Sequence, residues 1–405
     1  MDEGLGGKSK GPAREEAAYE KIGQLEYFAA GMPQSICSML YPCINKFWFF
    51  AWEACLEMKS RRIRILLAVI CTLYAASSPV HAADVVPEAP HCRYVNLKTI
   101  PITFVNEQVH VDATINDQPI NMFVDTGAVN TLLTRHAAER LGLKLGHARG
   151  VGGVGGESRG YQAVIEKLSI GPVEGKHQTM QIFWDSGLDD DNDGLIGADF
   201  LFQRDLELSI ANHQIKFMYP MNCKESANLA YWDENASFVD MQQVVPGTSA
   251  FPLGDPGREI IVLVNGQQLR AEIDSGANHS VIDLTAAKRA GIVPGSPGVV
   301  KLEGKASGIG SKGGDIWKAT FNEIAVGDEI VPHAKIVISD LWGALKADEP
   351  GADSSLFPEM LLGMDFLKKH HVLFAVSQHR FYFTYLGGGL FESELADVVS
   401  PAAAK

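Results

Sequence analysis

The sequence is short of tryptophan and of positive charge. Lys and Arg number 35 against 49 Asp and Glu, which gives a formal net charge of -14 at pH 7. An acidic chain offers no basic surface for nucleic acid or anionic lipid, so neither is expected as a partner. Six Trp against 40 Gly in 405 residues favour turn-rich β structure over a helical bundle.

The apolar run Ile65–Ser78 is too short for a comfortable transmembrane helix. It follows a basic stretch that starts at Met58 and precedes a small-residue cleavage site before Ala83, the pattern of a secretory signal peptide. We expect 1–57 to be a non-native extension and 58–82 to be removed. The product would be periplasmic or secreted, without stable membrane insertion. Alternatively, the N-terminal segment is real and retained, and the apolar run anchors the chain in a membrane.

Cysteine is also scarce. Of six cysteines, only Cys92 and Cys223 would remain after cleavage. Two cysteines in an exported chain favour a disulfide, which would tie the start of the mature protein to the segment near residue 220. Two unpaired thiols are the alternative.

The region after the signal contains an internal repeat at a spacing of 149 residues. Ile115–Leu143 aligns without a gap with Val264–Ile292, and F-V-D-T-G-A meets E-I-D-S-G-A. Each copy continues with a glycine-rich stretch and then an apolar signature, L-I-G-A-D-F-L at 195–201 and L-L-G-M-D-F-L at 361–367. The same parts in the same order indicate a duplicated domain.

Each copy shows the pattern of a hairpin, an aspartate loop and a short helix. Strands are expected at 109–115, 120–124, 259–264 and 269–273, with hairpin turns at Asn116-Asp117 and Asn265-Gly266. Helices are expected over 133–141 and 283–290, ending at Gly142 and Gly291. Alternating strand patterns return in 206–219 and 372–385, whereas 220–245 is polar and unpatterned and is expected to link the two halves.

These parts resemble the aspartic proteases. D-T-G-A and D-S-G-A, each followed by two residues and a hydroxyl (Thr131, Ser280), are similar to the active-site loops of that family. Neither glycine-rich stretch contains the tyrosine that pepsins carry, which favours the retroviral (retropepsin) branch in a tandem-duplicated bacterial form. The resemblance runs from about Ile100 to Gly387 and implies an all-β fold. It predicts two acid-protease β-barrel lobes related by a pseudo-two-fold axis, each with a short helix, over 93–219 and 246–388, followed by a tail at 389–405.

The resemblance also implies the site. Asp125 and Asp274 would form a catalytic dyad, and two carboxylates about 3 Å apart share one proton. The ionised partner can then activate water while the protonated one polarises the scissile carbonyl. The supporting loop residues would be Thr126, Gly127, Ala128, Ser275, Gly276 and Ala277. The substrate-covering flaps would use Gly152, Gly153, Val154, Gly155, Gly308, Ile309 and Gly310.

The expected activity is that of an aspartic endopeptidase acting on a peptide or protein, with no cofactor and no metal. Ala128 and Ala277 cannot donate the side-chain hydrogen bond that a hydroxyl would offer the carboxylates, so we expect an optimum of about pH 5 to 6, less acidic than in pepsins. Two alternatives stay open. The chain could be an inactive two-lobed relative that binds peptides. Each lobe could instead pair with a lobe of a second chain, whereas we expect a monomer with an intramolecular dyad.

Other motifs are discounted. The glycine patterns at 150–155 and 308–313 match a dinucleotide fingerprint, but no helical pattern follows them. G-E-S-R-G at 156–160 follows a glycine-rich loop rather than the strand that a nucleophile elbow needs. The acidic stretch 189–194 lacks the glutamate of a calcium loop and is expected to be a solvated turn. His370, His371 and His379 are expected on the surface.

Overall fold

The structure is a computed structural model, and it describes residues 91–105, 107–184, 192–242, 257–348 and 357–391, together with 351, 353 and 355. The chain divides into two compact units at residue 88, and all described residues belong to the second. The expected extension and signal peptide therefore lie outside the described residues. Within these ranges, no helix has the length and apolar character needed to cross a membrane.

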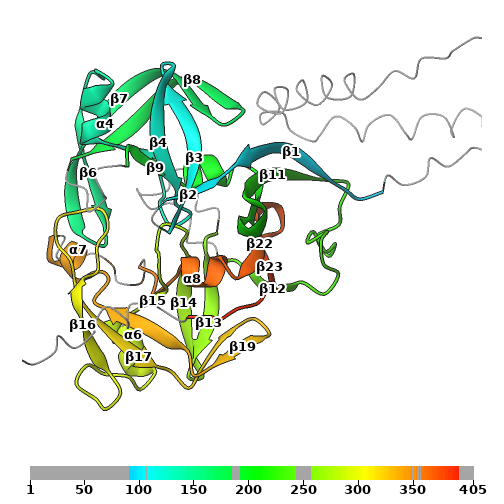
Figure 1. The fold of residues 1–405 in the computed structure, drawn as a ribbon, viewed down its shortest axis with the longest axis vertical. Helices are drawn as coiled ribbons and strands as arrows, with labels where there is room; N and C mark the ends of the chain where they lie inside the picture. Colours follow the sequence, from blue (N-terminus) through cyan, green and yellow to red (C-terminus); the bar gives the residue numbers. More distant parts are fainter. Residues whose placement is uncertain are drawn as a thin grey trace, which may run out of the picture. The chain divides into compact units, whose positions relative to one another are not determined.

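The N-terminal lobe is built on an eight-stranded sheet in the order β2-β3-β4-β9-β5-β8-β7-β6 (Figure 1). Its strands are β2 (Thr103–Val105), β3 (Gln108–Ile115), β4 (Gln118–Val124), β5 (Leu132–Thr134), β6 (Ala148–Gly153), β7 (Gly156–Ile170), β8 (Val173–Phe183) and β9 (Gly194–Ile196). The short helices α4 (Arg135–Arg140) and α5 (Ala198–Leu201) accompany them.

The C-terminal lobe repeats this plan in a nine-stranded sheet, ordered β16-β17-β20-β15-β21-β14-β13-β18-β19. Its strands are β13 (Glu259–Val264), β14 (Gln267–Ile273), β15 (Val281–Asp283), β16 (Val300–Lys305), β17 (Asp315–Thr320), β18 (Glu323–Val326), β19 (Glu329–Pro332), β20 (Lys335–Ser339) and β21 (Met360–Leu362). Its helices are α6 (Leu284–Arg289), α7 (Gly343–Asp348) and α8 (Met364–Leu367). The expectation of an all-β protein with a repeated lobe and short helices is confirmed.

The local signals of the sequence explain these elements. Asn116 and Asp117 have positive φ angles of 50° and 65°, as a two-residue hairpin turn requires, and the second copy uses Asn265 (49°) and Gly266 (76°). Helix α4 begins where the Thr134 side chain accepts the N–H of Ala137. The predicted strands and both predicted helices are confirmed, with the helices shorter than expected.

Each aspartate loop lies at the centre of its sheet. In the N-terminal lobe the loop at 125–131 joins β4 to β5, while β9 lies between them, parallel to β4 and antiparallel to β5. The C-terminal lobe repeats this with the loop at 274–280 and strands β14, β21 and β15. Buried apolar side chains of these strands fill the core, so the loops rest on a rigid base.

A third sheet of six strands contains strands from both halves of the chain, in the order β1-β11-β10-β22-β23-β12 (Figure 1). The strands are β1 (Arg93–Pro101), β10 (Asp205–Ser209), β11 (Gln214–Met221), β12 (Ser237–Asp240), β22 (His370–Ala375) and β23 (Arg380–Tyr385). The lobes are joined where β10 pairs with β22, with Leu206 opposite Phe374. Cys92 and Cys223 are joined in a disulfide.

Two expectations about these outer segments need correction. The stretch 220–245 contains β12, which pairs with β23, so it is not purely a linker. β12 has only four residues, which are too few to show the alternating pattern of a strand in the sequence. Each alternating tail divides into two strands around a single helical turn, which ends at His213 or His379 with a positive φ. His379 is exposed, as expected.

The prediction that His370 and His371 lie on the surface is wrong. His370 is fully buried, its ring stacks on Phe366 at 3.9 Å, and its Nε2 lies 3.0 Å from the Glu329 carboxylate. His371 is half-buried, and its Nε2 lies 3.0 Å from Glu207, which comes from the other lobe. Both partners are remote in the sequence, so their contacts left no local pattern.

Candidate active site

The two aspartate loops hold each other through the hydroxyl residues that follow the aspartates. The Thr126 N–H donates to Ser275 Oγ at 3.0 Å, and the Ser275 N–H donates to Thr126 Oγ1 at 2.9 Å. Each hydroxyl in turn donates to a backbone carbonyl of the opposite lobe, Thr126 to Ile273 at 2.7 Å and Ser275 to Val124 at 2.8 Å. Both side chains are fully buried, so these four bonds are shielded from water.

The carboxylate of each aspartate is oriented by its own loop. Asp125 Oδ1 accepts the backbone N–H groups of Gly127 and Ala128, at 3.0 and 2.9 Å. The C-terminal loop repeats the arrangement at 2.8 and 3.2 Å with Asp274, Gly276 and Ala277. The side chains of Ala128 and Ala277 supply no donor, so the backbone alone provides these bonds.

The two loops also cross at their glycines. A Cβ atom at Gly127 would stand 2.6 Å from Cγ of Asp274, and one at Gly276 would stand 2.6 Å from Cγ of Asp125. No side chain fits at such separations, so only glycine allows each backbone to pass beside the other lobe's carboxyl group. The structure thus brings together all eight loop residues expected from the sequence.

The electrostatics of the pair differ from those of two ordinary aspartates. Burial raises the pKa of Asp125 well above its usual range, and the negative charge of Asp274 raises it further. Burial also raises the pKa of Asp274, but the N–H of Gly276 and the positive charge of Arg258 oppose that rise. One proton shared between the two carboxyl groups is the state that this environment favours.

Two further aspartates brace the loops, and no sequence motif singled them out. Asp199 Oδ1 accepts both the N–H and the hydroxyl of Thr131, at 2.8 and 2.6 Å. Asp365 does the same for Ser280, at 2.9 and 2.5 Å. The signal was present, because both apolar signatures contain the same G-x-D-F-L, and the Asp is the only polar residue after the glycine.

The expected flap residues lie on two hairpins whose tips touch. Gly153 ends β6, and Val154 and Gly155 form the tight turn into β7. In the C-terminal lobe Ile309 lies in the loop between β16 and β17. The Gly155 N–H donates to the Ile309 carbonyl at 2.8 Å, and the Gly155 carbonyl accepts the N–H of Lys312 at 2.9 Å.

A small apolar cluster connects the N-terminal lobe to the flaps. Its four buried members are Phe123, Leu132, Phe183 and Leu195. Ala128 of the aspartate loop, Val151 of one flap and Ile309 of the other pack against them. The region around the dyad is therefore apolar on the side of this lobe.

Helix α7 contacts the flaps from the C-terminal lobe. The carboxylate of Asp348, at its end, accepts the N–H of Glu157 in β7 at 3.1 Å and forms an ion pair with Lys312. These bonds, together with the Lys312 ammonium, hold the pKa of Asp348 below its usual value. Helix α7 lies between β20 and β21, outside the motifs that the two copies share.

A buried ion pair next to the dyad was also missed. Arg258, which precedes β13, lies 2.8 Å from the Glu272 carboxylate on β14. Its guanidinium also donates to the carbonyls of Thr126 and Gly127 in the other lobe. Arg258 lies outside the aligned stretch Val264–Ile292, and Glu272 lies inside it opposite Phe123, so the alignment gave no sign of an ion pair.

The acidic stretch 189–194 is not a solvated turn at its described end. Asp193 is buried, accepts the N–H of Asn121 at 2.8 Å and pairs with Arg140 at 2.7 Å. Asp189 and Asp191 lie outside the described residues. Across the described part of the chain, no group of three or more His, Cys, Asp or Glu side chains is arranged to hold a metal ion.

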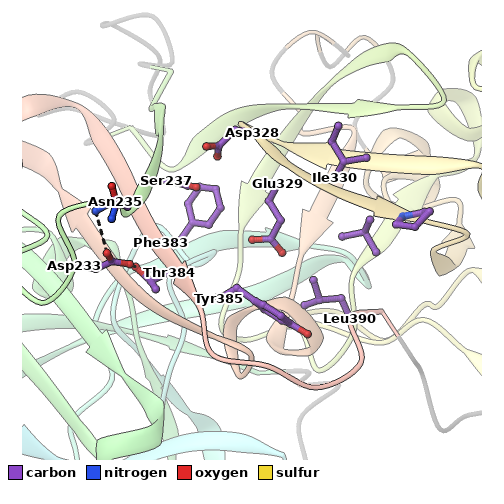
Figure 2. A pocket seen from close by; sticks show the side chains of 12 residues that line it. Asp233, Asn235, Ser237, Asp328, Glu329, Ile330, Phe383, Thr384, Tyr385 and Leu390 are labelled. Carbon is purple, nitrogen blue, oxygen red and sulfur yellow. Dashed lines mark hydrogen bonds between the residues drawn. The ribbon is translucent and has the colours of Figure 1, made fainter.

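A separate cavity of about 480 Å³ is lined by residues of β12, β19 and β23 (Figure 2). Three carboxylates and two aromatic rings face it, from Asp233, Asp328, Glu329, Phe383 and Tyr385. None of the dyad or flap residues lines it, so it is distinct from the site that the aspartate loops form.

Comparisons with known proteins agree with this geometry. A family model described as "Aspartyl protease" matches twice, at residues 111–200 and 260–366, once in each lobe. Each lobe therefore matches this family, and the two matches in one chain fit a tandem duplication. A comparison with curated proteins gives no match.

Solved structures give two further similarities. One is the aspartic proteinase from Irpex lacteus, with 12% identity and a TM-score of 0.45 over 73% of this chain and 98% of that one. The other is a retropepsin-like aspartic protease from Rickettsia conorii, with 20% identity and a TM-score of 0.23 over 32% of this chain and 94% of that one. Both scores are low, so the fold assignment rests on the strand pairing described above.

Proposed function

We propose that the protein is an aspartic endopeptidase that hydrolyses peptide bonds with a water molecule activated by Asp125 and Asp274. The ionised carboxylate accepts a proton from the water as it attacks, and the protonated carboxyl group donates to the carbonyl oxygen of the scissile bond. The observation that carries the proposal is the crossing of two aspartate loops from one chain, with each glycine against the opposite carboxyl group.

The surroundings of the dyad support the same function. The hydrogen bonds between Thr126 and Ser275 fix the two loops relative to each other, which is the pre-organisation that general acid–base catalysis needs. Val151 and Ile309 of the two flaps pack against the same cluster as Ala128 of the aspartate loop, and the backbone of such hairpins can bind an extended peptide of varied sequence. The apolar cluster around Phe123 would favour an apolar substrate side chain on the N-terminal side.

We further propose that the working form is a monomer and that it acts in the periplasm or outside the cell. The pairing of β10 with β22 within one chain supports the first point, because the two aspartate loops meet without a second copy. The disulfide supports the second, since such bonds persist in oxidising compartments.

The test is cleavage of denatured casein by the full chain from about pH 3 to about pH 8. Asp125→Asn and Asp274→Asn should each abolish cleavage, and the optimum should lie at about pH 5 to 6. Asp112→Asn, which removes an exposed carboxylate from β3, is the matched control and should retain wild-type activity.

The outcomes separate the two candidate functions. The wild-type chain could be folded by circular dichroism, cleave nothing, and still bind denatured casein in a pull-down. That result would favour a peptide-binding relative over a protease. Cleavage that survives in either Asn variant would contradict the dyad.

A further inference from the structure

The two lobes differ at one place beside the dyad. The spacing of 149 residues pairs Arg258 with Val109 and Glu272 with Phe123. In the N-terminal lobe both positions are apolar and buried, and Phe123 belongs to the cluster that extends to the flaps. In the C-terminal lobe the same two positions hold a buried ion pair.

The ion pair reaches across the lobe interface. Arg258 donates from Nη1 to the carbonyls of Thr126 and Gly127, both in the N-terminal aspartate loop. Gly127 is the residue whose backbone lies against the Asp274 carboxyl group. Gly127 therefore lies between the Arg258 guanidinium and the Asp274 carboxyl group. Glu272 lies on β14, two residues before Asp274.

We propose that Arg258 and Glu272 are positioning residues that hold the N-terminal aspartate loop from one side only and make the two dyad carboxyl groups unequal. The proposal rests on the proposed function and assigns the base and acid roles to different aspartates. Asp274 carries the negative charge in the resting enzyme and takes the proton from water, and Asp125 carries the shared proton and donates to the carbonyl.

The charge distribution agrees with this geometry. Arg258 opposes the rise in the pKa of Asp274, whereas the negative charge of Glu272 adds to the rise in the pKa of Asp125. Two other carboxyl groups pack against the loops, and both already accept hydrogen bonds there, Asp199 from Thr131 and Asp365 from Ser280. The flap tips bring glycines, Val154 and Ile309. Lys312 forms an ion pair with Asp348, so its charge is already balanced.

One further titratable group lies in the aspartate loops. His279 belongs to the C-terminal loop. Burial raises the pKa of Asp365, which braces Ser280, and the positive form of His279 opposes that rise. Among the charged groups that bear on the dyad, Arg258 and Glu272 are therefore the two whose replacement tests the proposal directly.

The experiment follows the carboxyl groups themselves. The full chain is labelled with ¹³C at aspartate carboxyl carbons, the two dyad signals are assigned with Asp125→Asn and Asp274→Asn, and each is titrated by NMR. Glu272→Gln removes a negative charge, which favours the ionised aspartates, so both midpoints should fall by about one pH unit. The pH profile of kcat/KM should shift to lower pH by the same amount.

A second variant avoids dependence on a single buried substitution. Arg258→Val with Glu272→Phe gives the C-terminal lobe the residues of its N-terminal counterpart, and the two dyad signals should then titrate more alike. kcat should fall by about tenfold or more with little change in KM, because the loop is displaced from the productive geometry. Arg270→Gln is the matched control. It breaks the neighbouring ion pair with Glu259 in the same hairpin, and it should leave the midpoints in place.

The proposal is overturned if the midpoints of the two aspartates stay unchanged in both Glu272→Gln and the double variant Arg258→Val with Glu272→Phe. An equal shift in Arg270→Gln would also overturn it. NMR titration needs no turnover, so it separates the two ideas. Shifted midpoints in a chain that cleaves nothing would support the positioning pair and reject the protease.

Discussion

The hydroxyl of Thr126 and the hydroxyl of Ser275 each accept the backbone N–H of the other residue across the lobe interface, at 2.9 and 3.0 Å. Each hydroxyl also donates to a carbonyl of the opposite lobe. All four bonds are buried, so the removal of one hydroxyl takes the partner from an N–H and a carbonyl of the opposite lobe.

Thr126→Val should therefore lower the free energy of unfolding by about 1 to 3 kcal/mol, measured by urea denaturation at constant pH. The valine keeps the shape of the side chain and loses only its hydrogen bonds. Thr126→Ser, which retains the hydroxyl, is the control and should lose less than half as much. Equal losses in the two variants would show that the methyl contact, rather than the hydrogen bonds, stabilises the interface.

Asp125 should make stability fall as the pH rises. Its pKa in the folded protein lies above the usual value, so the folded state holds a proton that the unfolded chain releases. The stabilising contribution is complete below the unfolded pKa and is lost as the pH rises towards the folded pKa. Within that window the loss is about 1.4 kcal/mol per pH unit.

Urea unfolding of wild type and Asp125→Asn at several pH values measures this dependence. The asparagine does not ionise, so the variant should be less sensitive to pH and should gain stability relative to wild type as the pH increases. Parallel curves for the two proteins would mean that Asp125 has an ordinary pKa.

Gly155→Ala should impair the flaps without unfolding the lobe. An added Cβ would stand 2.7 Å from the Ile309 carbonyl oxygen, so the two tips must separate. We expect kcat/KM to fall by about tenfold or more, because the backbone groups above the substrate are displaced. Gly150→Ala in the same hairpin meets only the flexible end of the exposed Glu157 side chain and should stay near wild type. Equal activity in the two alanine variants would contradict a role for tip contact.

Removal of the disulfide should cost about 2 kcal/mol, at the lower end of the usual range. Cys92 and Cys223 lie beside the paired ends of β1 and β11, where Arg93 is opposite Met221, so the sheet already holds these ends together. Cys92→Ser with Cys223→Ser should unfold at the same urea concentration with or without reductant, whereas wild type should be destabilised by reductant. A wild type that ignores reductant would indicate that the bond does not form.

The repeat explains why so much of the centre of each lobe was predictable. A hairpin, an aspartate loop and a short helix are local structures, and two independent copies of D-[TS]-G-A reduce the chance that either is an accident. The residues that were missed depend on contacts across the fold. Arg258 donates to the carbonyl of Thr126, 132 positions away in the sequence, and the His370 ring contacts the Glu329 carboxylate on another strand. Helix α7 lies outside the aligned parts of the two copies, so the comparison of the two halves could not reveal it.

The pairing of β10 with β22 lies within one polypeptide, so assembly of the two aspartate loops is a first-order process. Its equilibrium is independent of protein concentration, and dilution cannot separate the halves. A substitution in either half also appears once per molecule rather than twice. Each lobe is therefore free to acquire features the other lacks, and the C-terminal lobe already holds a charged pair where the N-terminal lobe holds valine and phenylalanine.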